Sequence, residues 1–162
     1  MADIVVDGKT RVAYVPACAA LGSPTTAEAN AGTLLHSRLL PTGLVGFESS
    51  SASVDNTKLD SVFDTSLPGR VSWSNVALIL SKDDGSPDTI FNLLTTPGTN
   101  FFLFIRDGVD AAQAWAAADK LEVYPMRNNT HTMQGRGEAN SLLRFQVPVN
   151  VTLKPNLKAV MV

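Results

Sequence analysis

Side chains that could perform chemistry are few in this chain and lie far apart in the sequence. It contains two histidines, His36 and His131, and a single cysteine, Cys18. Imidazole and thiolate groups are zinc ligands, but neither histidine has a second ligand at the spacing of a helix or a hairpin. We therefore expect two surface or loop histidines and no metal or other cofactor. No serine lies in a G-x-S-x-G motif, so the sequence predicts a protein that is not an enzyme.

Two polar loops contain residue types that could bind an ion or a phosphate. Residues 83–88 cluster three aspartates, but they lack the alternate-position ligands of a calcium loop. A turn that leads into a helix, with Ser86 as the N-cap and Pro87 at the first helical position, explains the same residues better. Residues 135–140 begin like a dinucleotide-binding loop, but the third glycine is missing and a strand follows. We interpret them as an ordinary loop.

Three arginines, Arg127, Arg136 and Arg144, make the stretch around the second loop locally basic. They could contact nucleic acid or an acidic neighbour, or they could belong to a solvated loop. The chain has 13 Lys and Arg against 15 Asp and Glu, a net charge of −2, which argues against a generally basic nucleic-acid binder. Because no aromatic stacking platform accompanies the arginines, the solvated loop is the favoured interpretation.

The elements that must position these residues are mostly strands. From Leu143 to Leu153 apolar and polar residues alternate, which places every apolar side chain on one face of a long strand. Pro148 has no N–H group, so we expect this strand to lie near the edge of a sheet that meets a neighbour. Residues 101–105 are apolar throughout, which predicts a strand buried on both faces.

Shorter patterns predict the remaining elements. The other predicted strands are a hairpin over residues 4–6 and 11–15 turned on Asp7-Gly8, a strand over 71–82 with a bulge near Asn75, and a strand over 120–124. The predicted helices cover residues 26–31, 87–94 and 111–118, and the last of these is the main one. Residues 48–56 are rich in serine and are expected to form a loop.

Together these elements predict one mainly β domain over residues 1–162. We expect a β-sandwich or flattened barrel flanked by one main α-helix, with a long irregular insertion at about residues 18–66. The N-terminal residues do not resemble a signal peptide, and no apolar run approaches the ~20 residues that a membrane-spanning helix needs. We therefore expect a soluble protein that is made in a cytoplasm and has no membrane partner.

Four segments carry a family resemblance. They are residues 7–16 (DGKTRVAYVP), 63–70 (FDTSLPGR), 114–125 (AWAAADKLEVYP) and 143–149 (LRFQVPV). In this order they resemble the major tail (tail tube) proteins of long-tailed, siphovirus-type phages that infect actinobacteria. The resemblance covers nearly the whole chain, and it depends on the joint occurrence of the segments because none of them carries chemistry.

The resemblance implies a structural virion protein that assembles in the host cytoplasm into hexameric rings. The rings would stack into a tail tube whose inner wall is a continuous β-barrel through which DNA is ejected. Its partners would be other copies of itself, the tape-measure protein and other tail proteins, with DNA passing transiently. Charged residues make up only 17% of the chain, which suits a subunit that hides surface in contacts with its copies. We expect few Arg and Lys on the lumen, because each would add affinity for DNA.

Two groups of residues are candidates for contacts between subunits or between rings. The apolar anchors of the insertion are Leu34, Leu35, Leu39, Leu40, Leu44 and Phe47. The long strand adds Arg144, Gln146 and Pro148. The alternative for the apolar anchors is that they pack on the chain's own core. Two other functions also stay open, namely another ring-forming phage tail or secretion-tube component and, less favoured, a β-sandwich ligand-binding module.

Overall fold

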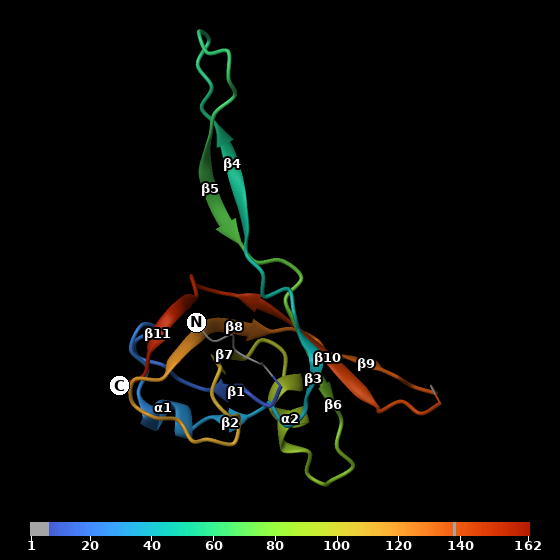
Figure 1. The fold of residues 1–162 in the computed structure, drawn as a ribbon. Coiled ribbons are helices and arrows are strands. Elements are labelled where there is room, and N and C mark those ends of the chain that lie inside the picture. The colour runs from blue at the N-terminus through green and yellow to red at the C-terminus, as the bar shows by residue number, and fades with distance from the viewer. Residues whose placement is uncertain (1–6, 138) are drawn as a thin grey trace.

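The computed structural model describes residues 7–137 and 139–162. Within these residues one antiparallel sheet of nine strands curls around a core in the order β2-β1-β7-β8-β10-β6-β3, with β11 paired to β8 and β9 paired to β10 (Figure 1). A separate two-stranded hairpin, β4-β5, projects away from this sheet. The mainly β fold class is confirmed, and the curled sheet agrees with the predicted β-sandwich or flattened barrel.

The bounds of the elements are as follows. The strands of the sheet are β1 Thr10–Val15, β2 Thr33–Leu34, β3 Leu39–Val45, β6 Ala77–Ser81, β7 Asn100–Asp107, β8 Lys120–Asn128, β9 Thr132–Gln134, β10 Arg144–Val151 and β11 Asn156–Val160. The hairpin consists of β4 Ser50–Asp55 and β5 Ser66–Ser72. The helices are α1 Thr26–Asn30 and α2 Thr89–Thr95. The predicted strand at residues 4–6 lies outside the described residues.

Both faces of the central strands are buried. In β1, Tyr14 belongs to one core cluster and the next residue, Val15, to a second one, because successive side chains of a strand point to opposite faces. Helix α2 contributes Leu94 to the first cluster, and helix α1 contributes Ala29 to the second. The strand predicted at residues 101–105 follows the same pattern in β7, with Leu103 in the first cluster and Phe104 in the second. Its prediction as a strand buried on both faces is confirmed.

The alternating strand near the C-terminus is confirmed over its central part. Phe145, Val147 and Val149 of β10 are buried in the first cluster. Leu143 and Leu153, at the two ends of the alternating pattern, are exposed and lie outside the strand. Alternation therefore identified the buried face correctly but overestimated the length of the strand.

The expected edge position of this strand is wrong. β10 pairs with β6 along one side and with β9 and then β8 along the other. Pro148 lies between the residues that pair with β9 and those that pair with β8, and its carbonyl accepts a hydrogen bond from the N–H of Asn129 at 2.9 Å. The N–H and C=O of one residue point to the same side of an antiparallel strand. The missing N–H of proline therefore falls at the change of partner, where it interrupts no ladder.

The main helix predicted at residues 111–118 is absent, and these residues form turns. The reason is Arg106 of β7, which is 1% exposed. Its guanidinium donates hydrogen bonds to the carbonyls of Asp110 (3.0 Å), Gln113 (2.7 Å) and Ala114 (3.0 Å) and to Oδ2 of Asp119 (2.6 Å). A helix would need these carbonyls for the N–H groups four residues further on. The chain wraps around the buried arginine instead.

Trp115, expected as the bulky anchor of that helix, anchors the loop. Its ring centroid lies 5.2 Å from the guanidinium carbon of Arg11 and 5.1 Å from that of Arg106, and it meets the edge of Phe104 at 6.4 Å. These cation–π and edge-to-face contacts cover the second core cluster where the sequence predicted a helix.

The two observed helices are short. Helix α1 has the predicted capping box: Oγ1 of Thr25 accepts from the N–H of Glu28 at 3.1 Å, and the Glu28 carboxylate accepts from the N–H of Thr25 at 2.8 Å. Helix α2 begins two residues later than predicted. Its N-cap is Asp88 and not Ser86, because Oδ1 of Asp88 accepts from the N–H of Phe91 at 3.1 Å.

The segment predicted as one strand over residues 71–82 is divided between β5 and β6. The interruption between the two strands lies where the sequence predicted a bulge. Asn75, within this interruption, has a positive φ of 56°. The serine-rich segment 48–56, expected to be a loop, contains β4, because β5 provides it with a partner. The stretch predicted as irregular, about residues 18–66, contains α1, β2, β3 and β4.

Candidate assembly surfaces

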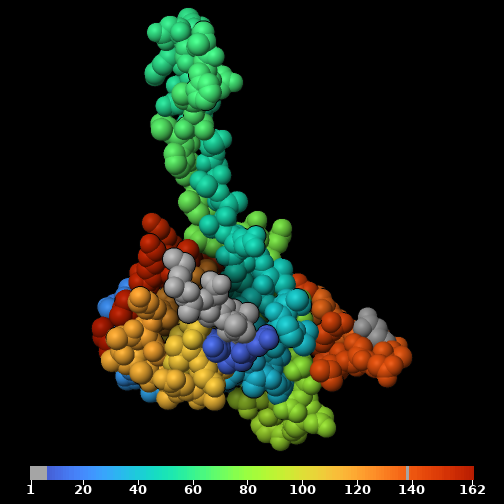
Figure 2. All heavy atoms as spheres, in the orientation of Figure 1, coloured from blue at the N-terminus to red at the C-terminus, as the bar shows by residue number. Residues whose placement is uncertain are grey.

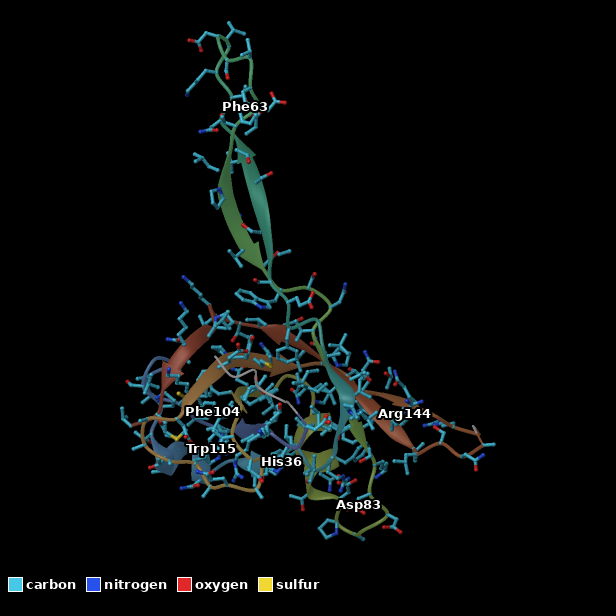
Figure 3. The ribbon with its side chains drawn as sticks, in the orientation of Figure 1. His36, Phe63, Asp83, Phe104, Trp115 and Arg144 are labelled. Atoms are coloured by element: carbon cyan, nitrogen blue, oxygen red, sulfur yellow. The ribbon has the colours of Figure 1, made fainter. Side chains whose placement is uncertain are left out.

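The two histidines and the aspartate cluster that the sequence singled out lie in turns and loops. In the described part of the chain no group of three or more His, Cys, Asp and Glu side chains could hold a metal ion. His36 lies in a turn, and burial lowers its pKa, while a backbone hydrogen bond to Val12 opposes this shift. His131 lies in a loop with its ring against the edge of Phe91, at 5.2 Å. Both histidines therefore occupy turns or loops, as the sequence predicted, and His36 is labelled in Figure 3.

The aspartate cluster at residues 83–88 is neutralised by protein cations. Arg38 binds Asp83 at 2.6 Å and Asp88 at 3.0 Å, and Lys82 lies 3.5 Å from Asp88. Burial pushes the pKa of Asp88 upward, but the N–H groups of Phe91 and Asp83 and the two cations outweigh burial and hold this pKa below its ordinary value. The turn-and-cap interpretation is confirmed, with Asp88 in place of Ser86 as the cap.

The most distinctive surface is the β4-β5 hairpin. Every residue of β4 is exposed, and β5 is exposed except at Gly69. Among the described residues, neither outer edge of the hairpin pairs with another strand. Figure 1 shows it standing clear of the curled sheet. A two-stranded hairpin that buries neither of its faces is only marginally stable in water, and contacts from outside the chain would stabilise it.

The end of the hairpin, residues 56–65, combines local hydrogen bonds with bare apolar side chains. The N–H of Thr65 donates to Oγ1 of Thr57 at 3.0 Å, which closes the end of the hairpin. Leu59 and Val62 are fully exposed, and Phe63 is 75% exposed (Figure 3). We call residues 56–65 the hairpin tip. Three large exposed apolar side chains within five residues are typical of an interaction site rather than of an ordinary turn.

A groove lies at the other end of the hairpin, where it joins the body. It is lined by residues of the hairpin base and by the turn between β10 and β11, and its cavity volume is about 1160 Å³. Its apolar lining includes Val71, Trp73, Leu153 and Leu157, and all but Trp73 are exposed. We call this the base groove. In the space-filling view the C-terminal segment lies beside the hairpin base (Figure 2).

The structure separates the apolar residues that the sequence grouped as candidate contacts. Leu35 is fully buried, and Leu39, Leu44 and Phe47 pack against the first core cluster. The ring of Phe47 meets that of Tyr124 edge-on at 5.0 Å. These four residues therefore pack on the core of their own chain, which is the alternative that the sequence left open for the apolar anchors. Leu34 is exposed and Leu40 is half-buried.

The three candidates on β10 lie on the face opposite its buried residues. Arg144, Gln146 and Pro148 are half-buried and are paired in register with Ser81, Ile79 and Ala77 of β6. The amide of Gln134 on β9 donates to Oε1 of Gln146. This face is thus a mixed polar and apolar surface of β6, β9 and β10, and Figure 3 shows Arg144 toward the far end of the β9-β10 hairpin.

Sequence reasoning missed both the tip and the base groove. The tip residues were not in an alternating pattern, and the groove combines segments that are about 80 residues apart. One signal of the tip was present in the sequence. Residues 59–63 contain three large apolar residues within a segment that is otherwise rich in Ser, Thr and Asp.

Comparison with known proteins decides the family. A family model described as phage tail tube protein matches residues 1–162. The chain belongs to the phage tail tube protein family. This phage tail tube protein is therefore a structural component of a phage tail, as part of the virion. Within the described residues no helix is long and apolar enough to cross a membrane.

A solved structure supports the fold of the tail tube protein. Its sheet resembles a chain in the cryo-EM structure of the anti-feeding prophage baseplate, which was symmetrised six-fold. The TM-score is 0.61 at 10% sequence identity, and the alignment covers 96% of each chain. This likeness concerns the fold alone. The search of curated proteins gave no match.

Proposed function

We propose that this tail tube protein assembles with itself into hexameric rings that stack into the tube through which phage DNA is ejected. The family match over the whole chain carries this proposal. The likeness in fold to a chain from a six-fold symmetrised assembly supports the ring symmetry. In this function the protein acts as a wall and performs no reaction.

The hairpin supports self-assembly on physical grounds. Its two faces and its outer edges bury nothing within the described chain. Contacts with neighbouring copies would cover these surfaces, and closed or stacked assemblies are a recognised way of protecting exposed strand edges. The insertion at about residues 18–66, with exposed Leu34 and half-buried Leu40, would bridge subunits or rings. The face of β10 with Arg144, Gln146 and Pro148 would provide a second contact or a part of the lumen.

The narrower parts of the proposal rest on the four sequence segments. Their resemblance to tail tube proteins is the basis for proposing long-tailed phages of actinobacteria as the source, and the tape-measure protein and other tail proteins as partners. The host cytoplasm is the proposed place of synthesis and assembly. For the lumen we expect few Arg and Lys, because a basic wall would hold the DNA that must slide through it. A map of the assembled tube with a basic lumen would contradict this expectation.

A second candidate is a ring-forming tail component that does not grow into a tube. The specific observation in its favour is the likeness in fold to a baseplate chain. The two candidates differ in one measurable property, because a tube subunit continues to stack whereas a baseplate or terminator subunit stops at a ring.

Negative-stain electron microscopy of the purified protein, together with its mass by light scattering, tests the proposal. Hollow tubes of uniform diameter with six-fold end views are the expected result. Single rings at every concentration would favour the second candidate. A monomer that stays dispersed at high concentration would contradict self-assembly of this chain.

A further inference from the structure

We propose that Arg11 and Trp115, on the side of the sheet that holds the second core cluster, bind a small monovalent anion such as chloride. The ion would accept hydrogen bonds from the Arg11 guanidinium and from the indole N–H of Trp115, and it would hold residues 108–119 against β1 and β7. The site belongs to a single chain, so this inference does not depend on the proposed function. Figure 3 shows Trp115 in the body, well away from the β4-β5 hairpin.

Two buried arginines lie directly opposite each other on neighbouring strands. Arg11 of β1 and Arg106 of β7 are cross-strand partners, and they are 7% and 1% exposed. Both side chains lie on the face of the second core cluster, because Ala13 and Phe104, two residues along the same strands, belong to that cluster. Like charges in directly opposite positions of a sheet destabilise it. The two arginines therefore require negative charge close by.

The described residues supply negative charge to only one of the two arginines. Oδ2 of Asp119 accepts a hydrogen bond from Arg106 at 2.6 Å. Arg11 forms no ion pair within the described residues, and its Nη1 donates to the carbonyl of Ala111. Burial lowers the pKa of Arg11, and the charge of Arg106 lowers it further, against the opposing effect of Asp119. Because a guanidinium stays protonated in proteins, the cluster contains two positive charges and one negative charge.

His36, in the turn after β2, adds no third positive charge. Burial lowers its pKa, a hydrogen bond to the backbone of Val12 opposes this shift, and the charges of Arg11 and Arg106 lower the pKa further. The ordinary pKa of histidine is ~6.5, so the lowered value leaves the imidazole neutral at pH 7. The excess is therefore one positive charge. One monovalent anion would balance it, as buried charges in proteins are normally paired.

Three buried N–H groups of this cluster have no acceptor among the described residues. They are Nε of Arg11, Nε of Arg106 and Nε1 of Trp115. The guanidinium carbons of Arg11 and Arg106 lie 5.2 Å and 5.1 Å from the ring centroid of Trp115, so the three side chains are in contact. Nearly all buried N–H groups in folded proteins are bonded to protein, water or a ligand. Water would supply an acceptor but no charge, whereas an anion supplies both.

The burial of the cluster limits the ligand to a small ion. The two guanidiniums donate to backbone carbonyls of residues 110, 111, 113 and 114, so this loop lies over the cluster. With only 7% of Arg11 exposed, a carboxylate on another protein chain has little access to it, whereas a single ion can enter. By fixing Arg11, the ion would also fix the loop carbonyl that this side chain holds.

Urea unfolding of the full chain tests whether chloride binds. It would be measured in sodium chloride and in sodium gluconate at equal ionic strength, because gluconate is too large for the site. Chloride should raise the unfolding midpoint until the effect saturates, and at about ten times its Kd it should multiply the folding equilibrium constant about elevenfold. Arg11→Met should abolish this dependence. The matched control Arg136→Met, at an exposed loop position, should keep it.

Trp115→Phe provides a second variant, which keeps an aromatic ring and removes the N–H donor. It should weaken the affinity for chloride at least about tenfold, because it removes a hydrogen bond to a charged acceptor. This variant also tests the inference if Arg11→Met does not fold. An unchanged chloride affinity in Trp115→Phe would contradict the role of the indole N–H.

The linewidth of chloride in NMR measures binding directly. Wild type and Arg136→Met should broaden the chloride signal, and Arg11→Met should not. No broadening and no chloride-dependent stability in the wild type would overturn the inference and assign the three N–H groups to water. An equal effect of chloride on wild type and on Arg11→Met would also overturn it, since it would show a general effect of salt. Neither result would affect the proposed assembly, which electron microscopy tests separately.

Discussion

The body and the β4-β5 hairpin are built from the same kind of element but differ in what their side chains contact. In the body, Leu103 and Phe104 are completely buried on opposite faces of one strand. In the hairpin, Val54 and Leu67 form a cross-strand pair, and both side chains are exposed. Both regions have antiparallel ladders, and both contain register shifts, so the pairing of strands alone does not distinguish them.

The comparison teaches that burial of faces, rather than pairing of strands, makes the body independent of other chains. A ladder hydrogen bond contributes about 0.5–1.5 kcal/mol net, because the unfolded chain bonds to water. Burying a large apolar side chain contributes about 1.5–3 kcal/mol. The body obtains both contributions from its own residues, whereas the hairpin can obtain the second only from a partner.

The largest expected effect of a single change is in the body, at Arg106. Arg106→Met should destabilise the monomer by about 3–5 kcal/mol, because it leaves Asp119 and the carbonyls of the loop without their buried donor. Urea unfolding followed by circular dichroism measures this loss. Arg136→Met, at an exposed loop position, is the matched control and should change stability by less than about 0.5 kcal/mol. Equal effects of the two variants would contradict the structural role of Arg106.

The same substitution in the two regions sharpens the comparison further. Leu78→Ala in the body should cost about 2–5 kcal/mol, because Leu78 is fully buried. Leu59→Ala in the hairpin tip should change the unfolding free energy of the monomer by less than about 0.5 kcal/mol. Only the second variant should weaken assembly while the monomer stays folded. A large loss of monomer stability from Leu59→Ala would show that the tip packs within its own chain.

A smaller and pH-dependent effect is expected at Asp88, which caps α2 within the body. Asp88→Asn should cost about 1–3 kcal/mol at pH 7, because it removes a charged acceptor from Arg38 and from two backbone N–H groups. The folded pKa of Asp88 is lowered, so its contribution is present above the unfolded pKa of ~3.9 and is lost as the pH falls toward the folded pKa.

Urea midpoints at pH 7 and at pH 3 measure this dependence. The difference between wild type and Asp88→Asn should shrink at the lower pH. Asp84→Asn, on the neighbouring exposed aspartate, provides the control and should show a small difference at both values. A difference in urea midpoint between wild type and Asp88→Asn that grows on acidification would contradict the lowered pKa of Asp88.

The smallest expected effect on the monomer comes from removing the whole tip. Asp55 and Ser66 are a cross-strand pair, so Asn-Gly can replace residues 56–65 as a two-residue type I′ turn. The unfolding free energy of the monomer should change by less than about 0.5 kcal/mol, because no tip side chain packs on the body. Rings and tubes should be lost in electron microscopy. Normal tubes from this variant would contradict any role of the tip in assembly.

Much of the fold followed from local sequence patterns. The alternation in β10 identified its buried residues, and the continuous apolar run in β7 identified a strand that is buried on both faces. The capping box of Thr25 and Glu28 placed α1 nearly to the residue. These successes share a cause, since each depends on side chains within one segment.

The candidate contact residues were only partly predictable. Apolar residues such as Leu35 and Leu34 are adjacent and look alike in sequence, yet one is buried and the other is exposed. Their difference depends on which strand lies against them, and that strand belongs to a distant part of the chain. The groove was not predictable for the same reason, since Trp73 and Leu153 come together only in the folded chain.

The sequence by itself therefore determined the class of the protein, its main buried strands and its family resemblance, because periodicity and composition are local properties. The tertiary structure alone decided that residues 111–118 wrap around Arg106 and that β10 lies between β6 and β8. It also decided that a serine-rich segment pairs with β5 and leaves the body as an arm. The physical reason is that these features depend on competition for donors, acceptors and apolar surface among residues far apart in the chain.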